Sequence, residues 1–264
     1  MNKKTLTKLE FYKITELLMN EATTPGGQRK CRNLKPSTDL TKIESMQEET
    51  AAAFTRIVKK GHLSFSGCYP IEESMKRLEV GAALNAAELL RIAKVLTAAG
   101  RAKAYGRHET IEELADCLDS YFDMLEPVSL LSTEIDRCII SEDEISDDAS
   151  STLRQIPFRI KATNDRIHTQ LSSLVAGSAR NYLQDSVITM RNGRYCVPVK
   201  AEHKSNVPGM VHDQSSSGST IFVEPLSVVK LNNELRELEI REQKEIEAVL
   251  AALSNQTCDH LDEL

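Results

Sequence analysis

The amino-acid sequence predicts a mainly α protein: a helical core plus a long antiparallel coiled-coil lever that carries a small antiparallel β module at its tip. Three observations support this fold class. Apolar residues recur at three- and four-residue steps over most of the 264 residues. Trp is absent and aromatic residues make up only 5% of the chain, which favours a helix-rich architecture. Between Thr189 and Asn233 the helical spacing gives way to short, strand-like runs.

The expected domain organisation has four parts. Residues 1–146 form a helical core domain, residues 147–185 an ascending lever helix, residues 186–225 a small β clamp-like module, and residues 226–264 a truncated descending lever helix. A small β module at the end of two helices is suited to reaching and gripping a partner.

Capping residues predict where the helices of the core begin and end. Short polar side chains accept hydrogen bonds from first-turn amides, proline suits a first turn, and glycine ends helices readily. The first of these helices begins at Pro25, after Thr24, and the second runs from Asp39 to Gly61. A third follows Pro70 and contains Met75 and Leu78, and a fourth begins after Asn85. Two more are expected over residues 114–125 and 128–140. Strand signals are nearly absent before Ser146.

Two apolar stripes predict the lever. The first contains Leu153, Ile156, Ile160, Ile167, Leu171 and Leu174, and the second contains Val228, Leu231, Leu235 and Leu238. Their approximately heptad spacing favours two antiparallel helices of about 35 residues, each about 50 Å long. Pro157 interrupts the first stripe. Because proline removes a hydrogen bond and crowds the preceding turn, we expect a kink or a helix restart near Ile156.

Four strands are expected in the β module, at residues 186–190, 194–200, 209–214 and 219–223. Asn192-Gly193 tolerates the positive φ angles of a tight hairpin turn, and the serines before Gly218 supply a second turn. We therefore expect a four-stranded antiparallel meander. A sheet of this size needs the helices beneath it for stability.

The net charge of −6 conceals strong segregation along the chain. Residues 1–35 carry a net charge of +5, residues 107–150 carry −12, and residues 151–185 carry +3. An acidic segment repels nucleic acid. The basic start, the first lever helix and the β module are therefore the surfaces suited to nucleic-acid contact.

The chain is expected to be cytoplasmic, without membrane contact. No stretch approaches ~18 uninterrupted apolar residues, and the basic start leads into an amphipathic pattern rather than an apolar signal core. The six cysteines are scattered without a Cys-x-x-Cys pair, so we expect them to be buried, small apolar residues.

No catalytic, metal or cofactor site is expected in this chain. His212 and Asp213 lie beside three serines, but neighbours in a strand point to opposite faces, so Asp213 cannot orient His212 as a triad acid does. The glycine-rich phosphate-binding motifs are absent, and the acidic clusters lack the glycine and spacing of a calcium loop.

Nucleic-acid binding by the β module is better supported than catalysis. Cationic donors and aromatic rings on a projecting hairpin suit contact with a phosphate backbone. The candidate nucleic-acid-binding residues are Arg191, Asn192, Arg194, Tyr195, Lys200, His203 and Lys204. Two alternatives stay open: an ordinary solvated turn, or a structural role in which Arg194 and Lys200 pair with Glu202 or Glu224.

Several motifs occur in order through essentially the whole chain. They are Leu9-Glu10-Phe11, Asp147-x-Ala149-Ser150, the segment 191–200, His212-Asp213-Gln214-Ser215-Ser216-Ser217-Gly218-Ser219-Thr220, and Glu224-Pro225 leading to Asn232-Asn233-Glu234-Leu235. Together they resemble the MutS-two family, a bacterial MutS paralogue that lacks the mismatch-reading domain. Pro157 departs from the pattern, because the family usually keeps a good helix former there.

The resemblance implies that residues 1–264 are the N-terminal part of a longer, dimeric protein. Such proteins continue into an ABC-type ATPase domain, which uses ATP and magnesium, and usually into a small Smr endonuclease domain. The resemblance also implies action on branched DNA to restrain homologous recombination, or on collided ribosomes through rRNA. The chain itself is then a non-enzymatic, nucleic-acid-gripping arm. The rival interpretation is a coiled-coil protein–protein adaptor.

Overall fold

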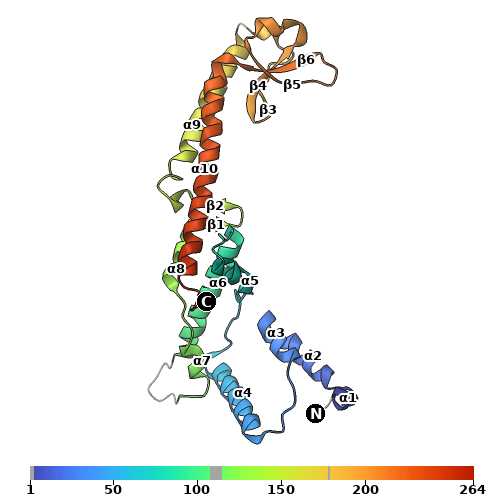
Figure 1. The fold of residues 1–264 in the computed structure, drawn as a ribbon, viewed down its shortest axis with the longest axis vertical. Coiled ribbons are helices and arrows are strands. Elements are labelled where there is room, and N and C mark those ends of the chain that lie inside the picture. Colours follow the sequence, from blue (N-terminus) through green and yellow to red (C-terminus); the bar gives the residue numbers. More distant parts are fainter. Residues whose placement is uncertain (1–2, 108–114, 178) are drawn as a thin grey trace. The chain divides into compact units, whose positions relative to one another are not determined.

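Helices make up most of the computed structural model, which describes residues 3–107, 115–177 and 179–264 (Figure 1). Within these residues the strands form two small antiparallel sheets, so the predicted mainly α class is confirmed. The chain divides into two compact units. One unit is Met1–Ile145 with Leu250–Leu264, and the other is Ser146–Val249.

The first unit is built from helices of very different lengths. In chain order they are α1 (Lys3–Lys8), α2 (Phe11–Glu21), α3 (Pro25–Arg32), α4 (Leu40–Lys60), α5 (Glu72–Glu79), α6 (Ala86–Gly106), α7 (Asp119–Asp123) and α8 (Ser129–Cys138). The last turns of α10 (Leu226–Cys258) belong to this unit as well.

The predicted helix starts are confirmed by the side chains that cap them. Thr24 before α3 and Asp39 before α4 each accept a hydrogen bond from the backbone amide three residues further on. Asn85 forms a reciprocal capping box with Glu88 at the start of α6. Gly61 follows the last residue of α4, and its φ of 80° is a conformation that glycine adopts without steric cost.

The core of the first unit lies between α6 and α8. Leu89 and Ile92 of α6 and Ile135 of α8 are fully buried. The end of α10 joins them, because the Ser254 hydroxyl accepts a hydrogen bond of 2.9 Å from the Leu84 amide. This bond satisfies a buried backbone donor just before α6 begins.

A strand hairpin replaces the end of the helix expected over residues 128–140. α8 stops at Cys138, and β1 (Ile139–Ser141) then pairs antiparallel with β2 (Glu144–Ile145). The predictions of helix through residue 140 and of a nearly strand-free core are wrong here. The two successive isoleucines of β1 are β-branched and favour extended backbone, and an acidic turn joins the strands.

A buried arginine ties α4 to the segment that leads into α7. The Arg56 guanidinium lies 2.7 Å from the Asp116 carboxylate and 2.5 Å from the Asp119 carboxylate, and it stacks over the Phe122 ring. These ion pairs hold residues 116–119 in a turn. Among the described residues the helix expected over 114–125 is therefore limited to α7, and Leu114 lies outside the described part.

The second unit contains two antiparallel helices, α9 (Ile156–Ala176) and α10 (Figure 1). Ser150, just before α9, donates a hydrogen bond of 2.7 Å to Glu245. Further along α9, Arg159 and Arg166 each lie 3.8 Å from Glu234. Residues later in the sequence of α9 therefore contact residues earlier in the sequence of α10, as antiparallel packing requires.

α9 is shorter than the ascending helix expected over residues 147–185. It has 21 residues, and short 3-10 turns flank it at η1 (Asp147–Ala149) and η2 (Arg180–Tyr182). Pro157 lies in the first turn of α9, where its missing N–H costs no helical hydrogen bond. The expected helix restart near Ile156 is confirmed, and one continuous helix over 147–185 is wrong.

The β module has four strands, but they do not form the expected meander. They are β3 (Thr189–Arg191), β4 (Arg194–Lys200), β5 (Gly209–Gln214) and β6 (Thr220–Pro225), in the spatial order β3-β4-β6-β5. The chain crosses from β4 to β5 through η3 (Ala201–Asn206). β6 is the more apolar strand and is buried at five of its six positions, so it takes the central place, whereas the polar β5 lies at the edge.

One apolar cluster joins the sheet to both helices of the second unit. Ile167 and Leu171 of α9 pack in the same cluster as Val197 of β4, Val223 of β6 and Leu231 of α10. The sheet therefore has the helical support that a module of this size needs. Each helix among the described residues is too short or too polar to span a lipid bilayer.

The cysteines are free thiols, and their burial differs. Cys138 and Cys196 are buried, whereas Cys117 is exposed, so the expectation that all six are buried is wrong. Burial raises the pKa of Cys196 to about 11, which keeps this thiol protonated at neutral pH. Only the thiolate is a strong nucleophile.

We therefore expect a maleimide to label Cys117 at least about tenfold faster than Cys196 in the folded chain at pH 8. Peptide mapping after timed quenching measures both rates. Cys117→Ser is the control and should remove the labelling of that peptide while leaving the rate at Cys196 unchanged. Equal labelling rates for the two thiols in the folded chain would contradict the burial described above.

Replacing Arg56 by Ala should lower the free energy of unfolding by about 3 kcal/mol at pH 7, because two carboxylates lose their buried partner. Arg29→Ala is the matched control. Arg29 pairs with Glu72 at 3.1 Å on the surface, and its loss should cost at most about 0.5 kcal/mol. Urea unfolding of the three proteins measures both effects.

The effect of Arg56 should depend on pH with a definite sign. The hydrogen bond from Arg56 lowers the pKa of Asp116 below its ordinary value of 3.8. The stabilisation is therefore complete above pH of about 4 and is lost as the pH falls through the lower pKa of the folded state. A difference between wild type and Arg56→Ala that grows on acidification would contradict this assignment.

Candidate nucleic-acid interface

The seven predicted site residues fall into two groups at opposite ends of β4. Arg191, Asn192, Arg194 and Tyr195 form the hairpin group, and Lys200, His203 and Lys204 form the η3 group. A strand of seven residues spans about 20 Å at ~3.3 Å per residue, so the two groups are separate surfaces. Each group has its own set of contacts.

The turn of the hairpin group has the conformation that the sequence predicts. Asn192 and Gly193 have φ angles of 51° and 71°, as the tight turn between β3 and β4 requires. The Asn192 side chain donates a hydrogen bond of 3.0 Å to the His212 carbonyl of β5. This candidate binding residue therefore helps to hold the module together.

Arg194 is engaged by a fully buried carboxylate, Glu224 of β6. Its guanidinium lies 3.1 Å from one Glu224 oxygen. The His212 ring nitrogen lies 2.6 Å from the other oxygen, and the Asn232 side chain donates to the first oxygen at 2.8 Å. Of the pairings considered from the sequence, that of Arg194 with Glu224 is the one present. We call Arg194, His212, Glu224 and Asn232 the Glu224 network.

Two asparagines at the start of α10 join the hairpin group to the helix. Asn232, which is 1% exposed, accepts from the Tyr195 amide and donates to the Tyr195 carbonyl, both at 3.2 Å. Asn233 accepts from Arg194 at 2.6 Å. The Asn232-Asn233 pair thus fixes β4 against α10, a structural role that was not predicted from the sequence.

Arg191, the other cation of the hairpin group, also has partners within the module. Arg191 lies 3.3 Å from the Asp213 carboxylate and 4.1 Å from the centre of the Phe222 ring. The Tyr195 ring makes an edge contact with His168 of α9 at 5.1 Å between ring centres. Most polar groups of this end of β4 therefore have partners within the module.

The η3 group lies beside η2 and is more open. The Lys200 ammonium approaches the Asn181 carbonyl at 3.5 Å, and the His203 ring lies 5.3 Å from the Tyr182 ring. Lys204 and Arg180 are exposed, and neither has an ion pair within the described part of the chain. We call Arg180, Tyr182, Lys200, His203 and Lys204 the η2–η3 surface. Arg180 and Tyr182 were not among the predicted residues, although the net +3 charge of residues 151–185 pointed to this segment.

The serine-rich loop forms a turn. The Ser215 hydroxyl accepts from the Thr220 amide at 3.1 Å, and Gly218 has a φ of 74°. His212 and Asp213 have different partners, Glu224 and Arg191 respectively. The register of β5 shifts between Val211 and Asp213, so the regular alternation of faces assumed from the sequence does not hold at His212.

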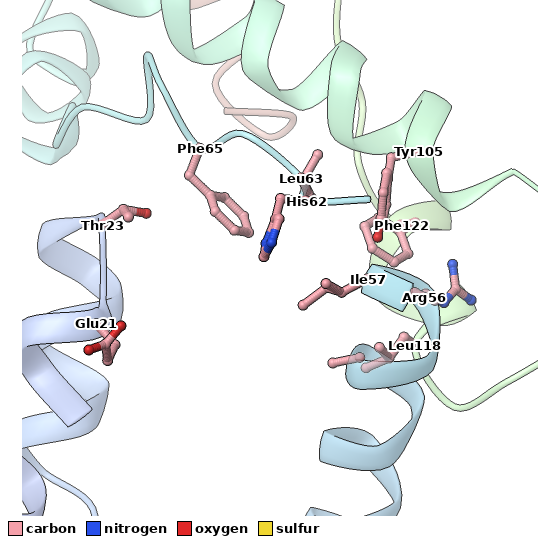
Figure 2. A pocket seen from close by; sticks show the side chains of 11 residues that line it. Glu21, Thr23, Arg56, Ile57, His62, Leu63, Phe65, Tyr105, Leu118 and Phe122 are labelled. Atoms are coloured by element: carbon pink, nitrogen blue, oxygen red, sulfur yellow. The ribbon is translucent and has the colours of Figure 1, made fainter. Parts of the chain in front are cut away.

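A separate hollow of about 400 Å³ lies in the first unit (Figure 2). Its wall is largely apolar and aromatic, with Ile57, Phe65 and Phe122 among the lining side chains. Arg56 also lines it, but its guanidinium is held by Asp116 and Asp119. Glu21 and His62 line it too, but most of the wall is apolar, so the lining suits packing against an apolar group.

Comparison with known proteins gives close relatives along nearly the whole chain, although no protein-family model matches it. Endonuclease MutS2 of Agathobacter rectalis is 53% identical, over 97% of this chain and 32% of the relative. Those of Lachnoclostridium phytofermentans and Lachnospira eligens are 52% and 51% identical, over 97% and 100% of this chain and 33% of each relative. The chain spans about a third of the length of these curated relatives.

We expect Arg194→Ala to lower the free energy of unfolding by about 2 kcal/mol, because a fully buried carboxylate loses its cationic partner. Arg191→Ala is the matched control. Its ion pair is partly exposed and should contribute no more than about 1 kcal/mol. Thermal melting of both variants tests the difference. Equal melting temperatures would show that the Glu224 network does not depend on Arg194.

Proposed function

This chain belongs to the MutS2 family, and on that premise we propose that it is the core, lever and clamp part of an ATP-driven protein that grips nucleic acid. In this proposal the chain itself is non-enzymatic. ATP and magnesium are bound, and strands are cut, by parts of the complete protein that residues 1–264 do not include.

The η2–η3 surface carries the proposal. It carries three cations: Arg180 in η2, Lys200 at the end of β4 and Lys204 in η3, of which Arg180 and Lys204 are exposed. Clustered exposed cations attract a phosphate backbone and release its counterions. The other predicted residues of the hairpin group stay candidates for contact, with Arg194 and Asn192 the least available because of their internal partners.

The lever is the second component of the proposal. The apolar contact of α9 with α10 continues into the sheet core through Ile167, Leu171 and Val223. A helix pair that shares one core with the sheet moves with it as a unit. We propose that this pair acts as an antiparallel coiled-coil lever that carries the clamp-like module and transmits movement to it.

The proposed partners are branched DNA, in the suppression of homologous recombination, or collided ribosomes, through rRNA. Both present phosphate backbones that are not continuous straight duplex. The complete protein is proposed to act as a homodimer. Binding of the complete protein to four-way junctions and to stalled ribosomes, measured side by side, distinguishes the two partners.

A protein–protein adaptor remains the second candidate, and one observation favours it. Apolar side chains on α2 and α4 are strongly exposed, among them Leu17 at 67%, Phe54 at 69% and Val58 at 68%. Exposed apolar patches mark surfaces that contact other proteins. Nucleic-acid binding that is absent, or that is insensitive to salt, would favour the adaptor.

The joint variant Lys200→Ala/Lys204→Ala tests the proposal. Each lost phosphate contact should flatten the slope of log affinity against log salt by roughly 1, so the double variant should flatten it by about 2 on a four-way junction. The free energy of unfolding should change by no more than about 0.5 kcal/mol, as for other surface substitutions.

Arg194→Ala is the control, because it should lower the melting temperature and leave the salt slope unchanged. If the double variant keeps the wild-type slope, Lys200 and Lys204 do not contact phosphate. If Arg194→Ala flattens the slope instead, the contact lies at the hairpin end of β4.

A further inference from the structure

A second hollow, of about 480 Å³, opens beside the η2–η3 surface. Its lining includes Leu174, Tyr182, Asn206, Pro208, Leu226 and Ser227, which come from α9, η2, η3 and the start of α10. The volume falls within the ~300–1,000 Å³ of small-ligand sites. All of these residues belong to the second unit.

Tyr182 gives the hollow a well-supported aromatic wall. Its ring packs on the apolar cluster of the second unit and lies 5.3 Å from the His203 ring, at an interplanar angle of 57°. Its amide donates to the Ala179 carbonyl at 2.8 Å, and the next residue, Leu183, bridges to Val199 of β4. The backbone that carries the ring is therefore fixed on both sides.

The rest of the lining is apolar with a few polar groups. Leu174 and Pro208 are apolar, whereas Asn206 offers an amide and Ser227 a hydroxyl. Two exposed cations flank the lining residues in the chain: Arg180 follows Ala179, and Lys204 precedes Asn206 by two positions. An aromatic wall, two hydrogen-bonding groups and adjacent cations match the parts of a nucleotide: base plane, base edge and phosphate.

We propose that this hollow holds one unpaired nucleobase of a bound strand. The base stacks on Tyr182, Asn206 and Ser227 meet its polar edge, and Arg180 and Lys204 meet the neighbouring phosphates. A paired base cannot enter without leaving the duplex, which costs a few kcal/mol of stacking and pairing. The site thus selects strands in which a nucleotide is already unpaired, as at a gap, a bulge or a branch point.

This inference rests on the proposed function and names the feature of nucleic acid that the module recognises. Base–aromatic stacking tolerates any base, because every base has a π face. Selection is therefore expected for the unpaired state and not for sequence. DNA and RNA share this chemistry, so both belong in the test.

The test uses the 264-residue chain and a duplex in which 2-aminopurine occupies one unpaired position. Matched probes carry the same base fully paired, and an RNA pair repeats the comparison. We expect the chain to bind the unpaired probe about tenfold more tightly than the paired one. Its fluorescence should be quenched on binding, as stacking on an aromatic ring requires.

Three variants separate stacking from charge and from folding. Tyr182→Leu keeps an apolar side chain on the core and removes the ring, so it should lose the tenfold preference and the quench, while Tyr182→Phe keeps both. Asn206→Trp places a large ring on the exposed rim of the hollow and should block entry without touching the core. Lys204→Ala should weaken binding of paired and unpaired probes by the same factor.

The outcomes distinguish this inference from the function it rests on. Equal binding of paired and unpaired probes, or a preference that survives both Tyr182→Leu and Asn206→Trp, overturns the nucleobase site and leaves the phosphate grip standing. Absence of salt-dependent binding to any probe overturns both. A preference for the unpaired probe that occurs only with RNA, or only with DNA, supports the site and shows which nucleic acid supplies the base.

Discussion

Burial of the Glu224 carboxyl group is the constraint on which the arrangement of the β module depends. Taking a carboxylate out of water costs several kcal/mol unless hydrogen bonds and a cation replace its hydration. The replacements come from three other elements: Arg194 from β4, His212 from β5 and Asn232 from α10. The carboxyl group is satisfied only when all of these elements are in place, so the network favours one register and one attachment of the sheet to the helix. Gly209 meets a different need, the close pairing of β5 with β6, because a Cβ there would collide with the Glu224 backbone carbonyl oxygen.

The Glu224 network also separates two sets of cations in the β module: those paired inside the module and those left open to solvent. The two arginines near Glu224 and Asp213, Arg194 and Arg191, are paired with carboxylates of the module. Cations at the other end of β4 have backbone carbonyls or solvent around them. The proposed grip would use the open basic surface, while the Glu224 network fixes the other end of β4 to α10. The exposure of a cation does not by itself separate a structural role from a contact role. Its distance from the buried Glu224 carboxyl group does.

Much of the fold follows from local rules in the sequence. Thr24, Asp39 and Asn85 cap their helices because their side chains reach amides within the same turn. The Asn192-Gly193 turn forms because both residues tolerate positive φ. Pro157 starts α9 because the first turn is where its ring fits. The family was also recognisable from motifs in order along the chain, and relatives at 51–53% identity confirm it.

What the sequence by itself determined was the mainly α class, the helix caps, the turns and the positions of most strands, because these depend on residues close together in the chain. Tertiary structure decided the place of β6 between β4 and β5, since strand order depends on which strand gains most from burial on both sides. It also decided the pairing of Arg194 with Glu224, thirty residues later, and the meeting of Tyr182 with His203. Such contacts join residues far apart in the chain, and the local pattern around each residue contains no information about its distant partner.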